Sequence, residues 1–149
     1  MNLEEKIMEG IKQAMKSHDK VALESLRAIK SAILLEKTSG AKGELDQAAE
    51  MKLLQKLVKQ RKESAEIYTQ QNRADLAEAE LAQAAVIEAY LPKQLSAEEL
   101  EAEVAAIIAQ TGASSPAEMG KVMGVASKAL AGKADGRAIA DTVKRLLAR

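Results

Sequence analysis

The sequence predicts an all-α protein, and two observations carry this prediction. Apolar residues make up 47% of the 149 residues, but there is no Phe or Trp and there are only two Tyr, so small and aliphatic side chains must fill the core. Such a core suits closely packed helices, because Ala, Leu, Met, Glu, Lys and Gln are strong helix formers. In addition, no stretch alternates apolar and polar residues over the length of a strand.

Four longer helices are expected in the first part of the chain, residues 1–92. Asn2 and Asp19 are suited to cap the first and the second helix. The fourth helix is rich in Ala and has an apolar stripe of Leu76, Leu81, Ala84, Ala85 and Ile87. The breaks after the first three helices are expected at 17–19, 38–43 and Asn72, and the fourth helix should end near Tyr90.

A small three-helix domain is expected in residues 96–149. Pro92 cannot continue the fourth helix, which places a domain boundary at 91–95. Ser96 with Glu99 has the capping-box pattern and opens the next helix, which ends at Gly112. The next helix is expected to start at Ser115–Glu118, with Ser as the cap and Pro at the first helical position, and to end at Gly132. Asp135 is expected to cap the last helix.

The charge and the cysteine count exclude several classes of protein. The formal net charge is zero, but residues 116–149 hold seven Lys/Arg against three Asp/Glu, so the basic charge gathers near the end. The absence of Cys excludes disulfides, zinc–thiolate sites and cysteine nucleophiles. There is no pattern of a signal peptide and no apolar run near the roughly 20 residues that cross a bilayer. We therefore expect a cytoplasmic protein without a membrane partner.

The most informative stretch is 119–137, in which glycines alternate with cations. On a helix, Met119, Val122, Met123, Ala126 and Leu130 share one face, which we expect in the core. Another face carries Lys121, Gly124 and Lys128 at i, i+3 and i+7. A glycine inside a helix costs about 1 kcal/mol relative to Ala, so Gly120 and Gly124 need a reason.

Two interpretations explain these glycines. In the first, the bare backbone lets a phosphodiester strand or a partner helix approach while the lysines neutralise phosphates. In the second, which is the commoner case, the glycines admit a neighbouring helix of the same small domain and the lysines are merely solvated. The next helix start, where backbone N–H groups favour anions, adds further candidates to the first interpretation. The candidate nucleic-acid-binding residues are Gly120, Lys121, Gly124, Lys128, Gly132, Lys133, Gly136 and Arg137.

Other polar groups are weaker candidates. A row of Lys52, Lys56 and Lys59, with Arg61 and Lys62 beside it, is typical of a solvated helix face and would be an auxiliary RNA contact at most. His18, the single His, lies in a turn without the partners that a catalytic His needs. Tyr68 and Tyr90 are expected at the edge of the core. No residues are expected to be catalytic, and no metal or other cofactor is expected.

Several stretches resemble the GatB/YqeY family. The segment Glu118–Gly124 (Glu-Met-Gly-Lys-Val-Met-Gly) and the segment 132–136 are similar to the shared motif of that family, and 25–27 and 89–92 resemble its stand-alone YqeY-like members. The resemblance covers nearly the whole chain. It implies an all-helical fold in two parts, related to the C-terminal tail of the B subunit of the aspartyl/glutamyl-tRNA amidotransferase.

The resemblance also implies a function, with tRNA as the expected partner. In the amidotransferase, this tail is understood to help hold the tRNA while a separate catalytic region acts on it. That region is missing here, so the glutamine-dependent carbon–nitrogen ligase activity of the parent enzyme is not carried over, and at most an accessory role in it is expected. The alternative is a protein-interaction adaptor that docks a partner, for example from the translation apparatus, on the Gly-rich basic face.

Overall fold

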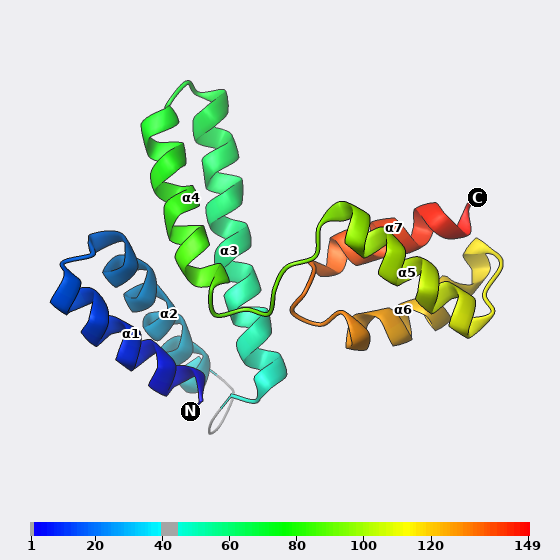
Figure 1. The fold of residues 1–149 in the computed structure, drawn as a ribbon, viewed down its shortest axis with the longest axis horizontal. Helices are drawn as coiled ribbons and strands as arrows, with labels where there is room; N and C mark the ends of the chain where they lie inside the picture. The colour runs from blue at the N-terminus through cyan, green and yellow to red at the C-terminus, as the bar shows by residue number, and fades with distance from the viewer. Residues whose placement is uncertain (1, 40–44) are drawn as a thin grey trace. The chain divides into compact units, whose positions relative to one another are not determined.

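The protein is all-α, as the sequence predicted. We describe a computed structural model, which covers residues 2–39 and 45–149. Within these ranges there are helices, turns and loops and no strand (Figure 1). The predicted turn at 38–43 lies outside the described residues from residue 40 on. The helices are α1 (Leu3–Ser17), α2 (Lys20–Ser39), α3 (Gln47–Gln70), α4 (Ala74–Glu88), α5 (Ala97–Thr111), the 3-10 turn η1 (Pro116–Glu118), α6 (Met119–Ala129) and α7 (Gly136–Leu147).

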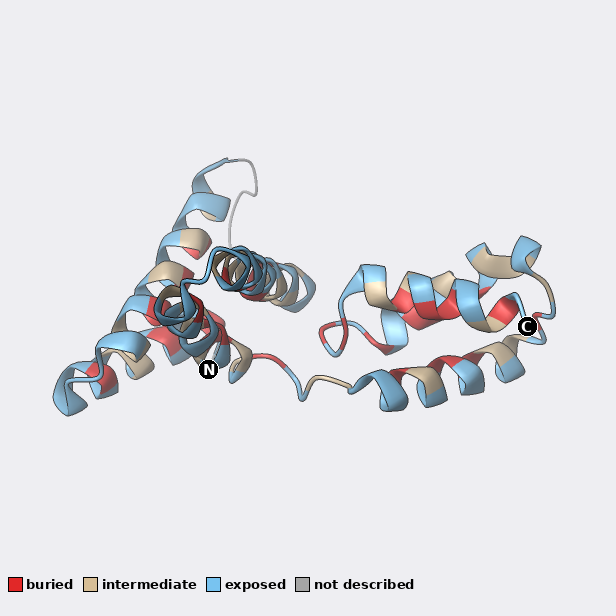
Figure 2. Ribbon diagram, turned by 90° about the horizontal axis from the view of Figure 1, so that it is seen from above, coloured by how far each residue is buried: buried red, intermediate tan, exposed pale blue. Residues whose placement is uncertain are grey.

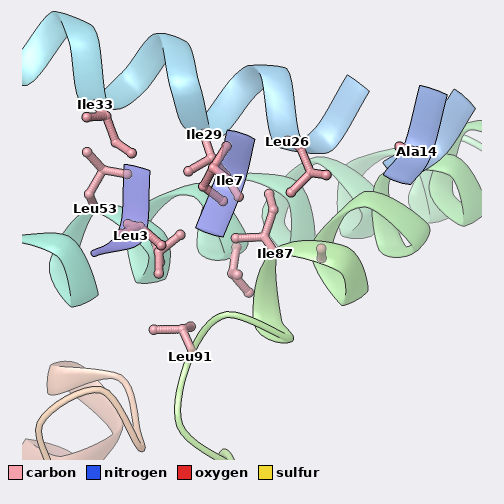
Figure 3. Close-up of a cluster of buried hydrophobic side chains, with 12 residues drawn as sticks. Leu3, Ile7, Ala14, Leu26, Ile29, Ile33, Leu53, Ile87 and Leu91 are labelled. Atoms are coloured by element: carbon pink, nitrogen blue, oxygen red, sulfur yellow. The ribbon is translucent and has the colours of Figure 1, made fainter. Parts of the chain in front are cut away.

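The chain divides into two compact units, Met1–Leu91 and Pro92–Arg149, and each has its own apolar core. In the first unit, each of α1 to α4 contributes one fully buried large side chain, namely Ile7, Ile29, Leu54 and Ile87. Figure 3 shows aliphatic side chains of this core, among them Ile7, Ile29 and Ile87, between the helices. Because the sequence has no Phe or Trp and Tyr90 is only partly buried at the edge, small and aliphatic side chains fill the core by interdigitation.

Local capping fixes the starts of the helices in the first unit. Asn2 Oδ1 accepts a hydrogen bond from the backbone N–H of Glu5 at 2.8 Å, and Asp19 Oδ1 accepts one from Ala22 at 3.0 Å. These caps satisfy N–H groups that have no partner inside the helix. His18 ends α1 in the left-handed conformation, with φ of 56°, and is exposed. The geometry thus gives His18 a role in chain reversal.

The fourth helix differs from its predicted stripe. α4 buries Ala77, Ala84 and Ile87, whereas Leu81 is 48% exposed. Ala85 is also exposed. Ala residues are spread around this helix, so several of its faces are similarly apolar and periodicity alone places the buried face poorly. The helix also ends at Glu88, two residues before the predicted end.

The second unit packs α5, α6 and α7 around a core of small aliphatic side chains. Val104, Val122 and Val143, one from each helix, have no exposed surface. Figure 2 shows burial as a stripe along each of these helices, with solvent-facing residues on the other side. α5 begins with the predicted capping box, since Ser96 Oγ accepts from the Glu99 N–H at 3.1 Å and the Glu99 carboxylate accepts from the Ser96 N–H at 3.0 Å.

No helix in the described ranges combines the length and the apolar character that a membrane span requires.

Candidate nucleic-acid interface

The candidate surface lies on α6, whose start differs from the prediction. Residues 116–118 form a 3-10 turn, and α6 begins only at Met119. The Ser115 hydroxyl makes no cap hydrogen bond; instead the Glu118 carboxylate accepts from the backbone N–H of Ser114 at 3.3 Å. The predicted Ser cap is therefore wrong, although the chain does turn into a helix at Pro116, whose fixed φ suits a first turn.

The core face of α6 is the predicted one. Val122, Ala126 and Leu130 are buried, and Met119 and Met123 pack partly buried against the same core. The opposite side is exposed and includes Gly120, Lys121, Gly124, Val125 and Lys128. The 3.6-residue periodicity thus separated the two faces of this helix correctly.

The glycines of α6 face open space. A Cβ atom placed on Gly120 or on Gly124 would meet no atom within 4 Å outside the backbone of its own helix. The interpretation that these glycines admit another helix of the small domain is therefore wrong. No close contact inside the unit requires a glycine at either position. Gly124 therefore lowers the helix propensity of α6 without a compensating packing contact.

Four cations near this face have no partner within the described parts of the chain. Lys121, Lys128, Lys133 and Arg137 are exposed and take part in no side-chain hydrogen bond or ion pair there. Other cations of the same unit are paired, since Arg145 and Arg149 lie 3.4 and 3.3 Å from a Glu101 carboxylate oxygen. Lys144, in the last turn of α7, is likewise exposed without such a partner in the described ranges, so the unpaired cations of this unit include those near the glycine face but are not confined to it.

The turn between α6 and α7 is held from within the unit. Gly132 is buried and has φ of 77°, a left-handed conformation that costs glycine little. Its carbonyl accepts a hydrogen bond from Gln94 Nε2 at 2.6 Å, and the Lys133 carbonyl accepts one from the Leu95 N–H at 2.9 Å. Gly132 therefore shapes the turn that presents Lys133, and its buried position does not offer it to a ligand.

Gln94 and Leu95 were missed at the level of sequence. They lie in the segment 91–95, which had been interpreted only as a domain boundary. Their contacts with 132–133 join residues 38 positions apart, and no local pattern announces such a pair. A polar side chain in a short segment between a Pro and a capping box was the single available signal.

The start of α7 is open to an anion. Asp135 occupies the N-cap position, as predicted, but its side chain makes no cap hydrogen bond. Gly136 and Arg137 in the first turn are exposed, and a Cβ atom on Gly136 would meet nothing within 4 Å. First-turn N–H groups have no partner inside a helix, and the helix dipole adds partial positive charge there. Two exposed cations, Lys133 and Arg137, thus lie beside this helix start, together with the carboxylate of Asp135.

The basic row of the first unit is only partly engaged. Arg61 donates to Gln83 Oε1 at 3.1 Å, and Lys62 pairs with Glu88 at 2.6 Å, so these two cations serve the packing of α3 against α4. Lys52, Lys56 and Lys59 are exposed and have no such partner among the described residues. The same ranges contain no group of three or more His, Asp or Glu arranged to hold a metal ion.

Tyr90 lies at the edge of the first core, as predicted. It is half-buried and packs against the cluster around Ile87. Burial raises the pKa of its phenol above the ordinary value of 10.0, because desolvation disfavours the phenolate. Tyr68 is likewise half-buried, so neither ring is presented as a fully exposed stacking platform.

Comparison with known proteins places the chain in a family. The model of the YqeY-like protein family matches residues 4–147. "Altered inheritance of mitochondria protein 41, mitochondrial" of Meyerozyma guilliermondii is 40% identical over 81 residues, which are 54% of this chain and 42% of that protein. The aligned region thus spans less than half the length of this relative. Since the family model covers almost the entire chain, the protein belongs to the YqeY-like protein family.

Proposed function

We propose that the second unit is a tRNA-binding module and that α6 with the start of α7 is its contact surface. The observation that carries the proposal is the open glycine face of α6 beside cations that have no ion-pair partner among the described residues. A solvated helix would be more stable with Ala at Gly124. A ligand that approaches the helix backbone closely would explain the glycine, and unpaired lysines indicate a ligand with negative charge.

The spacing of the cations suits a phosphate backbone. Lys121 and Lys128 are seven residues apart, which is about 10 Å along the axis of a helix. Gly124 lies between them on the same exposed face. A phosphodiester chain along this face would meet a cation at each end, with Gly124 on one side of the line between them and the exposed Val125 on the other. Lys133 and Arg137, at the open start of α7, continue the positive surface.

The proposed role is to hold RNA and not to transform it. The resemblance to the tail of the amidotransferase B subunit suggests tRNA, and it suggests an accessory part in a glutamine-dependent amidation carried out by another protein. This chain offers phosphate contacts of the kind that position a nucleic acid without reading its bases. We therefore expect affinity for tRNA with little dependence on its sequence.

The test is a titration of total tRNA across a salt series. Lys121→Glu combined with Lys128→Glu should weaken binding strongly and reduce the slope of log K against log salt by about 2, because two phosphate contacts are lost. Lys12→Glu with Lys16→Glu, two exposed lysines of α1, changes the net charge equally and is the matched control. Equal loss in both double variants would show that net charge alone matters, and unchanged binding in the first would refute the proposed surface.

A protein-interaction adaptor is the second candidate, and one observation favours it. Val125 is 42% exposed directly after Gly124, so the exposed side of α6 is not purely polar. A partner helix could use the glycine face for close approach. Capture of partners with and without RNase separates the candidates. Partners that survive RNase, are lost in Gly124→Leu and are retained in Lys121→Glu with Lys128→Glu would favour the adaptor over the tRNA module.

A further inference from the structure

A groove with an apolar floor lies between α2 and α3 in the first unit, whereas the proposed tRNA surface belongs to the second unit. Its volume is about 260 Å³. The floor is formed by Ala32 and Leu35 of α2 and by Leu53 and Leu57 of α3. The lining also includes two charged residues, Glu36 on α2 and Lys56 on α3. The groove therefore combines an apolar base with one charged position on each side.

An exposed leucine extends the apolar surface at the α2 side. Leu35 is 68% exposed, whereas Leu53 is only 9% exposed. An apolar side chain at such exposure lacks the favourable free energy of burial. A partner that covers this α2 edge would gain that free energy, which makes it a candidate docking edge.

A row of cations borders the groove at the α3 side. Lys52, Lys56 and Lys59 follow one another at i, i+4 and i+7, and they are exposed without an ion-pair partner among the described residues. The row runs along the same two turns of α3 that supply Leu53 and Leu57. Three cations on this side outweigh the single carboxylate of Glu36 on the other, so the groove is complementary to an acidic edge.

The length of the groove defines its occupant. The lining residues of α3 run from 53 to 60 and those of α2 from 32 to 39, which is about 10 Å, or two helical turns, on each side. Two turns of a docked helix present anchors at i, i+3 or i+4, and i+7. A nucleic acid would satisfy the lysines but would leave Leu35 uncovered.

We propose that this groove docks an acidic amphipathic helix of a partner protein. Its apolar anchors cover Leu35 and the floor, and its carboxylates lie along Lys52, Lys56 and Lys59. This interaction is independent of tRNA binding, because it uses other residues on the other unit. It would let the protein attach to a partner while the second unit remains open to RNA.

The test uses a synthetic 16-residue peptide with Leu at helical anchor spacing and Glu along one flank, measured by fluorescence anisotropy with the full chain. Leu35→Glu should weaken its binding on the order of tenfold or more, as for a lost interface anchor. Leu81→Glu, an exposed leucine of α4, should leave it unchanged. The same peptide with Lys in place of Glu should bind on the order of tenfold more weakly, because it faces the lysine row with like charge.

Four outcomes would overturn the proposal. One is equal binding of a scrambled peptide of identical composition, and another is unchanged binding in Leu35→Glu. The third is binding of tRNA that falls on reversal of Lys52, Lys56 and Lys59 but ignores Leu35→Glu, which would make the row an RNA surface. Self-association of the chain that disappears in Leu35→Glu would assign the groove to a second copy instead. Circular dichroism verifies the fold, and the α6 variants test tRNA binding separately.

Discussion

Gly10 in α1 and Gly124 in α6 are both glycines inside a helix, and their surroundings are opposite. A Cβ atom on Gly10 would lie 2.5 Å from Tyr90 Oη and 3.0 Å from Leu26 Cδ1. A Cβ atom on Gly124 would meet nothing within 4 Å. Each glycine costs its helix about 1 kcal/mol relative to Ala. At Gly10 packing within the unit offsets this cost, because the missing side chain lets Tyr90 reach α1.

The difference teaches where an explanation must be sought. A glycine that neighbouring side chains contact closely is required by the packing of the core, and its cost in helix propensity is offset within the unit. A glycine that faces solvent has no such offset inside its own unit, which agrees with the proposed approach of a ligand to α6. The comparison therefore supports a binding role for α6 and no binding role for the glycine of α1.

The largest effect is expected at Gly10. Gly10→Ala should lower the free energy of unfolding by about 1–2 kcal/mol, because overpacking of about 1–3 kcal/mol exceeds the gain in helix propensity. In a Tyr90→Phe background, which removes the phenolic oxygen, the loss should shrink or change sign. Urea unfolding followed by circular dichroism measures this double-mutant cycle. The same loss in both backgrounds would show that the contact with Tyr90 is not the reason for this glycine.

Gly124→Leu tests the other side of the comparison. The new side chain projects from the exposed face of α6 between Lys121 and Lys128, so it should weaken tRNA binding on the order of tenfold, which corresponds to about 1.4 kcal/mol. The free energy of unfolding should not fall, because the side chain meets no atom of its own unit and Leu is a good helix former. If the leucine variant binds tRNA as tightly as the native protein, tRNA does not approach the α6 backbone closely at Gly124.

Gly124→Ala should stabilise the second unit by about 1 kcal/mol, the full difference in helix propensity, because nothing must move to admit the methyl group. Thermal unfolding compared with Gly10→Ala measures this contrast of sign directly. Destabilisation at Gly124 would mean that its surroundings are occupied in solution, contrary to the open face described above.

Much of the fold followed from local chemistry. The caps at Asn2, Asp19 and Ser96 and the core face of α6 were all predictable, because each depends on residues within one or two turns. The start of α6 and the buried face of α4 were not. At the start of α6, the side chains of Ser115 and Glu118 can both accept hydrogen bonds from nearby backbone N–H groups, and the sequence does not show which one does. On α4 the abundance of Ala makes several faces similarly apolar.

The candidate surface was predictable in part, for the same reason. Helical spacing placed Lys121, Gly124 and Lys128 on one exposed face, which is where they lie. Whether Gly124 met a neighbour depended on tertiary packing, and so the sequence left two interpretations open. The hydrogen bond from Gln94 to Gly132 joins distant segments, and the buried position of Gly132 could not be inferred without it.

The starts of α5 and α7 repeat the contrast between satisfied and open groups. At α5 the capping box satisfies the first turn, whereas the Asp135 side chain at α7 makes no cap hydrogen bond. The pKa of Glu99 is lowered from its ordinary value of 4.5, first by the hydrogen bond from the Ser96 backbone, then by the Ser96 side chain and by the charge of Lys93. The capping box is therefore the part of this unit that should respond to acid.

The smallest effect is the acid dependence of this cap. Because the pKa of Glu99 is lowered in the folded state, its contribution is fully present above pH 4.5 and is lost as the pH falls through the folded pKa. Glu99→Gln keeps an acceptor for the Ser96 N–H but cannot titrate, so the loss of stability on acidification should be smaller than in the native chain. Asp135→Asn, which removes a carboxylate without a cap hydrogen bond, is the matched control and should leave the acid profile as it is. Urea midpoints between pH 6 and pH 3 measure the difference. If both variants flatten the profile equally, general repulsion would explain the acid response, and the contrast between the two helix starts would lose its energetic basis.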